Sequence, residues 1–178
     1  MTGSVKEGKD AGVQGEKKKM TGLSPEKKYA CMTLLIMTFI FIQSAFPGDL
    51  SGRESGFIAR FVAVLFQGDL EEVSFFVRKG AHFTEYLLLG ISLFLWIRER
   101  GRSGKNLPDR VFGRPGWTSL AAWTAGTVYA LTDEIHQLFV ADRSGQIRDV
   151  VIDSAGVLAG ILLTKLLHHY IHKGVHDI

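Results

Sequence analysis

Acidic, basic and aromatic side chains recur at helical spacing inside two apolar stretches of this sequence. They are Lys79, His82, Glu85 and Tyr86 in the first stretch and Asp133, Glu134, His136 and Gln137 in the second. A charged group at the centre of a membrane helix costs roughly 2.5–3.5 kcal/mol on insertion scales, so such a group generally has a partner or a function. Carboxylates beside imidazoles can transfer protons as general acids and bases. The catalytic candidates on this ground are His82, Glu85, Asp133 and Glu134.

A third polar set follows the second stretch. Arg143 lies in a short loop, and Asp149 and Asp153 are one helical turn apart at the start of the next apolar stretch. Carboxylates can accept hydrogen bonds from hydroxyl, amide or amine groups, whereas Arg143 and Lys79 can hold a phosphate or a carboxylate. The predicted ligand-binding residues are therefore Lys79, His82, Glu85, Tyr86, Asp133, Glu134, Gln137, Arg143, Asp149 and Asp153.

The distribution of charge along the 178 residues is more informative than the overall composition. Nearly all the charge lies in a polar head, two loops and the tail, between long apolar runs. The basic clusters flank apolar runs and are not interleaved with aromatic residues on a folded face, so we expect no binding to nucleic acid. The single cysteine, Cys31, lies in an apolar run and is interpreted as a small hydrophobic residue.

Four apolar runs are long enough to cross a membrane as helices, which predicts an all-α integral membrane protein. The predicted spans are Tyr29–Phe46, Gly80–Ile97, Trp117–Val140 and Asp149–Leu167. We interpret the first as a retained helix and not as a signal peptide, because it is long and no small-residue cleavage site follows it. Together they predict a four-helix membrane domain over residues 29–170.

The segments outside the four runs are polar. Residues 1–28 are predicted to form a disordered cytoplasmic tail and residues 171–178 a second cytoplasmic tail, because neither can bury enough apolar surface to fold. The loop 47–79 contains a shorter apolar stretch, Phe57–Phe66, which cannot span a bilayer. We predict a short interfacial helix there.

The orientation follows from the lysines and arginines that flank the spans. Fifteen of the 21 lie in the N-terminal tail, in the loop between the second and third spans, and at the C-terminal end. Because Lys and Arg are enriched in cytoplasmic segments, both termini are predicted to be cytoplasmic. All three polar sets then lie in the outer half of the membrane, on three different segments.

Structural and metal-binding interpretations compete with this functional one. Charged residues near helix ends can pair across helices simply to hold a bundle together. The spacings His82-x-x-Glu85 and Asp133-x-x-His136 could also ligate a divalent ion. Two such pairs are weak evidence, and we expect neither a metal nor another cofactor. Ser144 is interpreted as a turn residue, and Gly156-x-x-x-Gly160 as a site of close helix packing.

Several blocks of these residues occur together, in one order, over about residues 30–170. They are Phe41-Ile42-Gln43-Ser44 with Pro47; Lys79-Gly80-Ala81-His82-Phe83 with Glu85-Tyr86 and Leu89-Gly90; Asp133-Glu134 with His136-Gln137 and Phe139; and Arg143-Ser144-Gly145 leading to Asp149, Asp153, Gly156 and Gly160. In these blocks the sequence resembles the VanZ-like family of bacterial membrane proteins. One departure is Asp153, where the family often carries Asn.

The resemblance implies a four-helix protein of the bacterial plasma membrane. The family takes its name from a protein associated with low-level resistance to the glycopeptide teicoplanin, and membership supplies no reaction. Our first hypothesis is a site at the outer leaflet that binds or modulates a cell-envelope component and lowers teicoplanin susceptibility. The partners would be membrane lipids, a cell-wall precursor or the glycopeptide. The alternatives are a membrane enzyme that acts on an envelope lipid or precursor by carboxylate and histidine acid–base chemistry, and a proton-coupled carrier.

Overall fold

A computed structural model describes residues 22–47, 59–64, 69–104, 114–141, 143 and 145–176. Within these residues all regular secondary structure is helical, as the sequence predicts. The four long helices are α1 (Pro25–Ala45), α3 (Leu70–Ser103), α5 (Pro115–Gln137) and α6 (Ile147–His176). A short helix also covers residues 59–64, within the predicted interfacial stretch Phe57–Phe66, whose remaining residues lie outside the described part of the chain.

Two helices begin earlier than the apolar runs indicate, because polar residues cap them. At α1, the side chain of Ser24 accepts a hydrogen bond from the backbone N–H of Lys27 and Pro25 occupies the first turn. At α3, the side chain of Asp69 accepts hydrogen bonds from the backbone N–H groups of Glu71 and Glu72. The prediction of a loop over residues 47–79 is therefore wrong for residues 70–79, which belong to α3.

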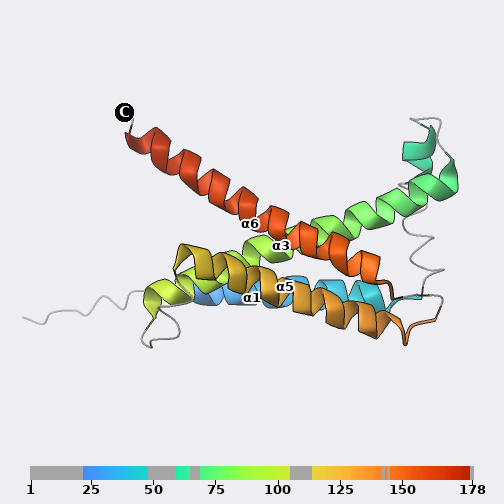
Figure 1. Ribbon diagram of the computed structural model, residues 1–178, viewed down its shortest axis with the longest axis horizontal. Helices are drawn as coiled ribbons and strands as arrows, with labels where there is room; N and C mark the ends of the chain where they lie inside the picture. The colour runs from blue at the N-terminus through green and yellow to red at the C-terminus, as the bar shows by residue number, and fades with distance from the viewer. Residues whose placement is uncertain are drawn as a thin grey trace, which may run out of the picture.

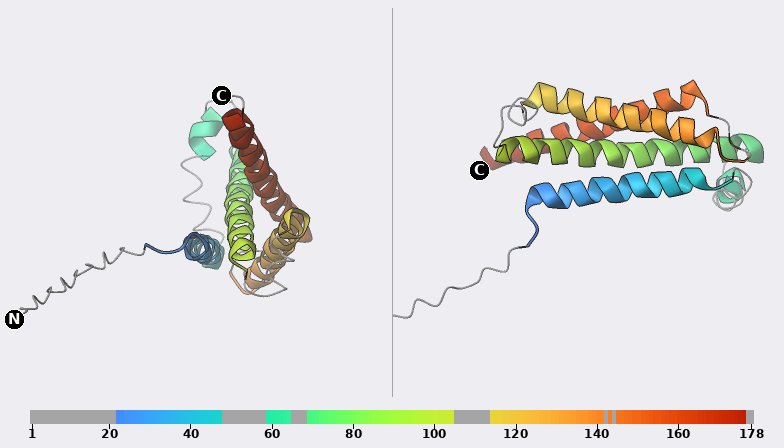
Figure 2. Two further views of the ribbon diagram at one scale, coloured as in Figure 1. Left: turned by 90° about the vertical axis from the view of Figure 1, so that its left-hand side faces the viewer. Right: turned by 90° about the horizontal axis from the view of Figure 1, so that it is seen from below.

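α3 is the central helix of the molecule, since it contacts α1, α5 and α6, and α5 in turn contacts α1 and α6. Figure 1 shows α6 crossing α3, with α5 in front of α1. The start of α1 and the end of α6 lie at one end of the molecule, on the left of Figure 1. The ends of α1 and α5, the starts of α3 and α6 and the short helix 59–64 lie at the other end, as the right-hand view in Figure 2 also shows.

Three stretches of helix are long and apolar enough to cross a membrane: Pro25–Ala45, Leu70–Ser103 and Ile147–Ile171. α5 is not among them; it contains many Gly, Ala, Ser and Thr residues and carries Asp133 and Glu134 near its end. At 1.5 Å per residue, the 34 residues of α3 measure about 51 Å, which exceeds the thickness of a hydrocarbon core. A membrane-spanning α3 that is not strongly tilted would therefore extend beyond the apolar layer on at least one side.

The crossing of α3 and α6 depends on glycines that let the two backbones touch. A Cβ atom on Gly156 would lie 2.6 Å from the carbonyl oxygen of Phe83, and one on Gly160 would overlap the carbonyl oxygen of Leu87. On α3, a Cβ atom on Gly90 would overlap the backbone of Val157. The structure thus confirms the close packing predicted from Gly156 and Gly160. Buried apolar side chains pack around this crossing, among them Tyr86, Leu89, Val157 and Ile161.

The C-terminal end of α6 continues further than the apolar run predicts. The predicted fourth span ends at Leu167, but the helix extends to His176 without a break. Residues 171–176, predicted as part of a polar tail, are therefore helical. Likewise, residues 25–28 of the predicted N-terminal tail belong to α1, while residues 1–21 lie outside the described part.

Candidate functional site

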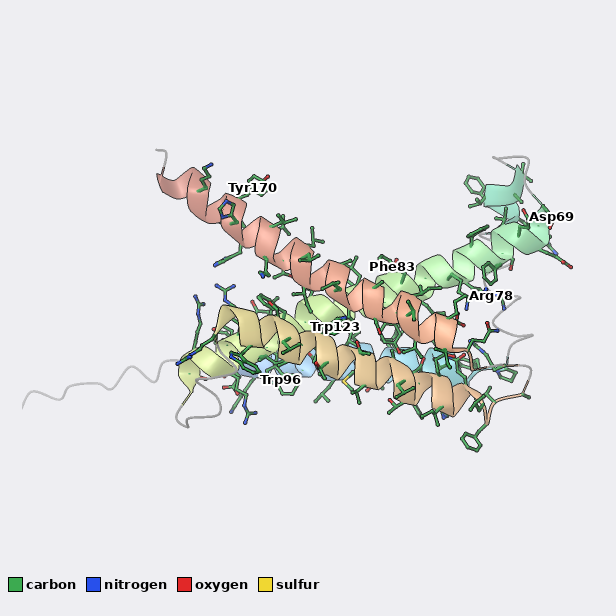
Figure 3. All side chains as sticks on the ribbon, in the orientation of Figure 1. Asp69, Arg78, Phe83, Trp96, Trp123 and Tyr170 are labelled. Carbon is green, nitrogen blue, oxygen red and sulfur yellow. The ribbon has the colours of Figure 1, made fainter. Side chains whose placement is uncertain are left out.

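The predicted site residues come together at the end of the molecule where α1 and α5 finish and α3 and α6 begin. Figure 3 shows Asp69 and Arg78 of α3 at this end, whereas Trp96 and Tyr170 lie towards the opposite one. All ten predicted binding residues are among the described residues. Ser144, which was interpreted as a turn residue, is not.

A buried polar network at the end of α5 joins this helix to α1. Asp133 is 3% exposed, and its Oδ2 accepts hydrogen bonds from Ser44 Oγ at 2.9 Å and from Gln137 Nε2 at 3.2 Å. Gln137 Nε2 also donates to Glu134 Oε1 at 3.3 Å. The other oxygen of Glu134, Oε2, accepts a hydrogen bond from the backbone N–H of Gln146 at 2.8 Å. Glu134 therefore fixes the loop that leads into α6.

Arg143 ties the same loop to the end of α1. Its Nε donates to the carbonyl oxygen of Phe46 at 3.2 Å, and its Nη2 donates to the carbonyl oxygen of Gln43 at 3.2 Å. These carbonyls end a helix, where acceptors are left unpaired and a positive charge is favourable. The pKa of the guanidinium is lowered by burial and by the charge of Arg78, against which Asp133 and other carboxylates act. Arginine remains charged under such shifts.

Lys79 and Asp149 form an ion pair between α3 and α6. Both side chains are largely buried, at 22% and 13% exposure, so this contact is better shielded from solvent than a surface pair. The ammonium of Lys79 also lies over the ring of Phe75, 5.5 Å from its centroid, and the guanidinium of Arg148 lies at the same distance from that ring. Phe75 thus contacts one cation from α3 and one from α6.

His82 and Glu85 face one another on α3, with 3.8 Å between His82 Nδ1 and Glu85 Oε2. Both atoms are buried and have no hydrogen-bond partner among the described residues. Several further buried atoms nearby share this condition: Tyr86 Oη, Asp133 Oδ1, His136 Nε2, Asp149 Oδ1 and Asp153 Oδ2. Buried polar atoms are rarely left unpaired in folded proteins, so these atoms could form hydrogen bonds with a ligand or with water.

A cavity of about 220 Å³ opens between α3, α6 and the loop before α6. Seven of the predicted residues line it: Lys79, His82, Glu134, Gln137, Arg143, Asp149 and Asp153. Glu85, Tyr86 and Asp133 do not line it. The structure therefore divides the predicted set into a group around the cavity and a group of three away from its wall.

Four residues that the sequence analysis did not name line the cavity: Phe75, Arg78, Gln146 and Ile152. Ser44, which the sequence analysis named in a family-like block without assigning it a role, donates a hydrogen bond to Asp133. Arg78 could have been found from its place next to Lys79 in a predicted polar set. Ser44 is a polar residue at the end of an apolar run, which is a weaker signal, since serine is common at helix ends.

The structure gives no support to a metal centre. Among the residues that it describes, no group of three or more His, Cys, Asp or Glu side chains is arranged to hold a metal ion. In particular, the imidazole of His136 is stacked on Phe41, with 4.5 Å between the ring centroids. His136 therefore packs against α1.

Comparison with known proteins identifies the family. No match was found among curated proteins or solved structures. The model of one protein family, VanZ/LLP1, matches residues 29–168. This range covers the four long helices up to the last turns of α6 and includes every predicted site residue. The three apolar helices and this match together indicate a membrane protein. The chain belongs to the VanZ/LLP1 family.

Proposed function

We propose that this protein binds a component of the cell envelope in the charged cavity between α3 and α6, at the outer leaflet of the bacterial plasma membrane. The observation that carries the proposal is the cavity of about 220 Å³, which three cationic and three carboxylate side chains line at one end of an otherwise apolar set of helices. Burying so many ionisable groups only to connect helices would be costly, because apolar side chains pack helices without that penalty.

The proposed topology has four spans with both termini in the cytoplasm. α5 is the fourth span in this proposal, because its two ends lie at opposite ends of the molecule alongside α3 (Figure 1). The start of α1 and the end of α6 share one end, which supports placing them on one side of the membrane. The excess of Lys and Arg in the segments at that end makes it the cytoplasmic side. The cavity then faces the outer leaflet.

Binding at this position would change what a membrane-associated glycopeptide can reach. Family membership links such a protein to lowered susceptibility to teicoplanin, and we propose that phenotype for this chain. The cavity would act by holding an envelope lipid, a cell-wall precursor or the antibiotic. Its charged groups would form charge-assisted hydrogen bonds with the bound molecule. Such bonds are roughly twice as strong as hydrogen bonds between neutral groups.

The test compares susceptibility to teicoplanin and vancomycin in a sensitive Gram-positive host that expresses wild-type protein or single variants at matched membrane abundance. Arg78→Gln and Asp149→Asn change the cavity wall, and Arg148→Gln removes an exposed cation at the same end that does not line the cavity. We expect protection by wild type and Arg148→Gln, and loss of protection in the two cavity variants. Equal protection by all four proteins would overturn the proposed site, and no protection by wild type would overturn the phenotype.

The contact between His82 and Glu85 favours a second candidate, an enzyme that acts on an envelope lipid or cell-wall precursor. The two side chains lie 3.8 Å apart with unpaired buried atoms, an arrangement in which a proton could pass between them and a substrate. Mass spectrometry of lipids and precursors from expressing cells tests it. A modified species that appears with wild type and is absent with Glu85→Gln would establish the enzyme; identical profiles would exclude it.

A further inference from the structure

We infer that the ligand of this cavity is an aminoalkyl phosphate, a group in which a primary ammonium lies a few bonds from a phosphate. This inference rests on the proposed function and specifies the chemistry of its ligand. Such a group can be presented by the headgroup of a phospholipid or by a soluble or polymer-bound phosphate ester. Acidic and basic side chains both line the cavity, and some of their hydrogen-bonding atoms have no partner among the described residues.

The cavity wall carries as many acidic side chains as basic ones. Three side chains are cationic and three are carboxylates: Arg78, Lys79 and Arg143 against Glu134, Asp149 and Asp153. A cavity built for a simple anion would carry an excess of positive charge, and one built for a simple cation an excess of negative charge. A ligand with both charges therefore fits better than a singly charged one.

The negative part of the wall has free acceptors. Asp153 is 1% exposed and lines the cavity, yet its Oδ2 has no hydrogen-bond partner among the described residues. Asp149, one helical turn away, uses Oδ2 for Lys79 and leaves Oδ1 unpaired. By contrast, Glu134 has both oxygens in hydrogen bonds. Two unpaired carboxylate oxygens on one face of α6 suit a primary ammonium, which offers three N–H donors.

Among the described residues, one cation in the positive part of the wall has no hydrogen-bond or ion-pair partner. Lys79 is paired with Asp149, and Arg143 donates from Nε and Nη2 to two carbonyls of α1. Within the described residues, Arg78 has no ion-pair or hydrogen-bond partner, although its charge acts on Arg143. The guanidinium of Arg78 is thus the group that can bind a phosphate bidentately, with the remaining donors of Arg143 close by.

The experiment measures lipid retention by the full-length protein in nanodiscs that contain equal parts of phosphatidylethanolamine, phosphatidylcholine and phosphatidylglycerol. The lipids that stay bound after transfer to detergent are identified by native mass spectrometry. Phosphatidylcholine has a quaternary ammonium without N–H donors, and phosphatidylglycerol has hydroxyl donors without a positive charge. We expect phosphatidylethanolamine to be retained about tenfold better than either, since charged hydrogen bonds contribute about 1.5–3 kcal/mol.

Two cavity variants and one control assign the retention to this site. Asp153→Asn keeps the shape of the side chain and replaces the carboxyl acceptor Oδ2 by an amide, and Arg78→Gln removes the cation; both should abolish the preference for phosphatidylethanolamine. Arg148→Gln should retain it, because Arg148 does not line the cavity. Thermal unfolding of each protein in detergent confirms that the variants are folded. Arg78 is exposed, so its variant remains informative if Asp153→Asn does not fold.

A soluble ligand distinguishes the two sources of the group. O-phosphoethanolamine is titrated against the protein in nanodiscs of pure phosphatidylcholine, and the shift in thermal unfolding is measured. A saturable shift that Arg78→Gln loses would place the source on the aqueous side. Retention of the lipid without such a shift would place it in the bilayer. Either result supports the inference.

Equal retention of the three phospholipids, with no shift by O-phosphoethanolamine, would overturn the inference. A preference for phosphatidylglycerol that Arg78→Gln abolishes would also overturn it, but would leave the proposed binding function intact. The susceptibility assay described above fails or succeeds independently of lipid identity, so the two proposals can be told apart.

Discussion

The two ends of the contact between α3 and α6 are held together in opposite ways. At the crossing, Gly90, Gly156 and Gly160 bring backbone against backbone, and apolar side chains fill the surroundings. Towards the start of α6, the contact passes through the ion pair of Lys79 and Asp149, and a cavity remains between the helices. Close packing leaves no room for a ligand, whereas a polar contact with unpaired atoms does. The crossing therefore fixes the geometry, and the polar end is free to bind.

The largest effect should come from adding one methyl group at the crossing. Gly160→Ala places a Cβ atom against the carbonyl oxygen of Leu87, where neither helix backbone can yield without moving its neighbour. Overpacking of this kind typically costs about 1–3 kcal/mol, and we expect the upper part of this range because the obstruction is backbone. The measurement is the free energy of unfolding in mixed micelles, followed by circular dichroism.

The same substitution at Gly80 is the control. Gly80 lies within α3, and nothing lies within 4 Å of the position of an added Cβ atom. Because Ala is favoured over Gly in a helix by about 1 kcal/mol, Gly80→Ala should stabilise the protein slightly. If both variants were equally stable, the crossing would not be the tight contact described above.

A smaller loss is expected when the polar end loses its central cation. Arg143→Gln removes the hydrogen bonds to the carbonyl oxygens of Gln43 and Phe46 and leaves Asp133 with less compensating charge. We expect a loss of roughly 2 kcal/mol, the order of a charged hydrogen bond in a partly buried setting. Limited proteolysis near residue 46 should also accelerate, because α1 loses a link to the loop before α6. Unchanged stability and proteolysis would show that α1 is held by other contacts.

The main features of the fold could be predicted from the sequence because hydrophobic segment length is a strong signal. The four helices appear where the apolar runs lie, and Gly156 and Gly160 make the predicted close contact. The helix ends were less predictable. The start of α3 depends on a capping interaction of Asp69, which leaves no mark on hydrophobicity, and the extension of α6 past Leu167 passes through polar residues that an apolar run does not include.

Which residues belong to the site could be predicted more fully than how these residues are arranged. Helical spacing placed Lys79, His82, Asp149 and Asp153 near one another, and all four line one cavity. Periodicity cannot say how far each helix is rotated about its axis, so it could not separate these residues from Glu85, which does not line the cavity. Contacts between distant segments, such as Ser44 with Asp133, depend on tertiary packing and leave no local pattern.

A modest effect is expected from Ser44→Ala. The variant removes the hydrogen bond that Ser44 Oγ donates to Asp133 Oδ2. Gln137 Nε2 also donates to this oxygen, so Asp133 Oδ2 keeps one partner. We expect a loss of about 1 kcal/mol, the typical net contribution of a neutral-donor hydrogen bond. A double-mutant cycle with Asp133→Asn measures the coupling directly, since the second variant keeps the volume of the side chain. A coupling energy of zero would mean that the two residues are adjacent without interacting.

The smallest effect on stability should come from Arg78→Gln. This variant tests whether Arg78, unlike Arg143, is a binding residue and not a structural one. Arg78 and Arg143 line the same cavity, yet Arg78 is exposed and has no partner among the described residues, whereas Arg143 holds two carbonyl groups. Substitutions of exposed residues away from such contacts usually change stability by less than about 0.5 kcal/mol. Measured in the same micelles, Arg78→Gln should unfold like wild type while Arg143→Gln does not. Because the chemical change is identical, a loss of stability in Arg78→Gln as large as that in Arg143→Gln would mean that Arg78 is also structural, and the cavity would then have no cation free to bind a phosphate.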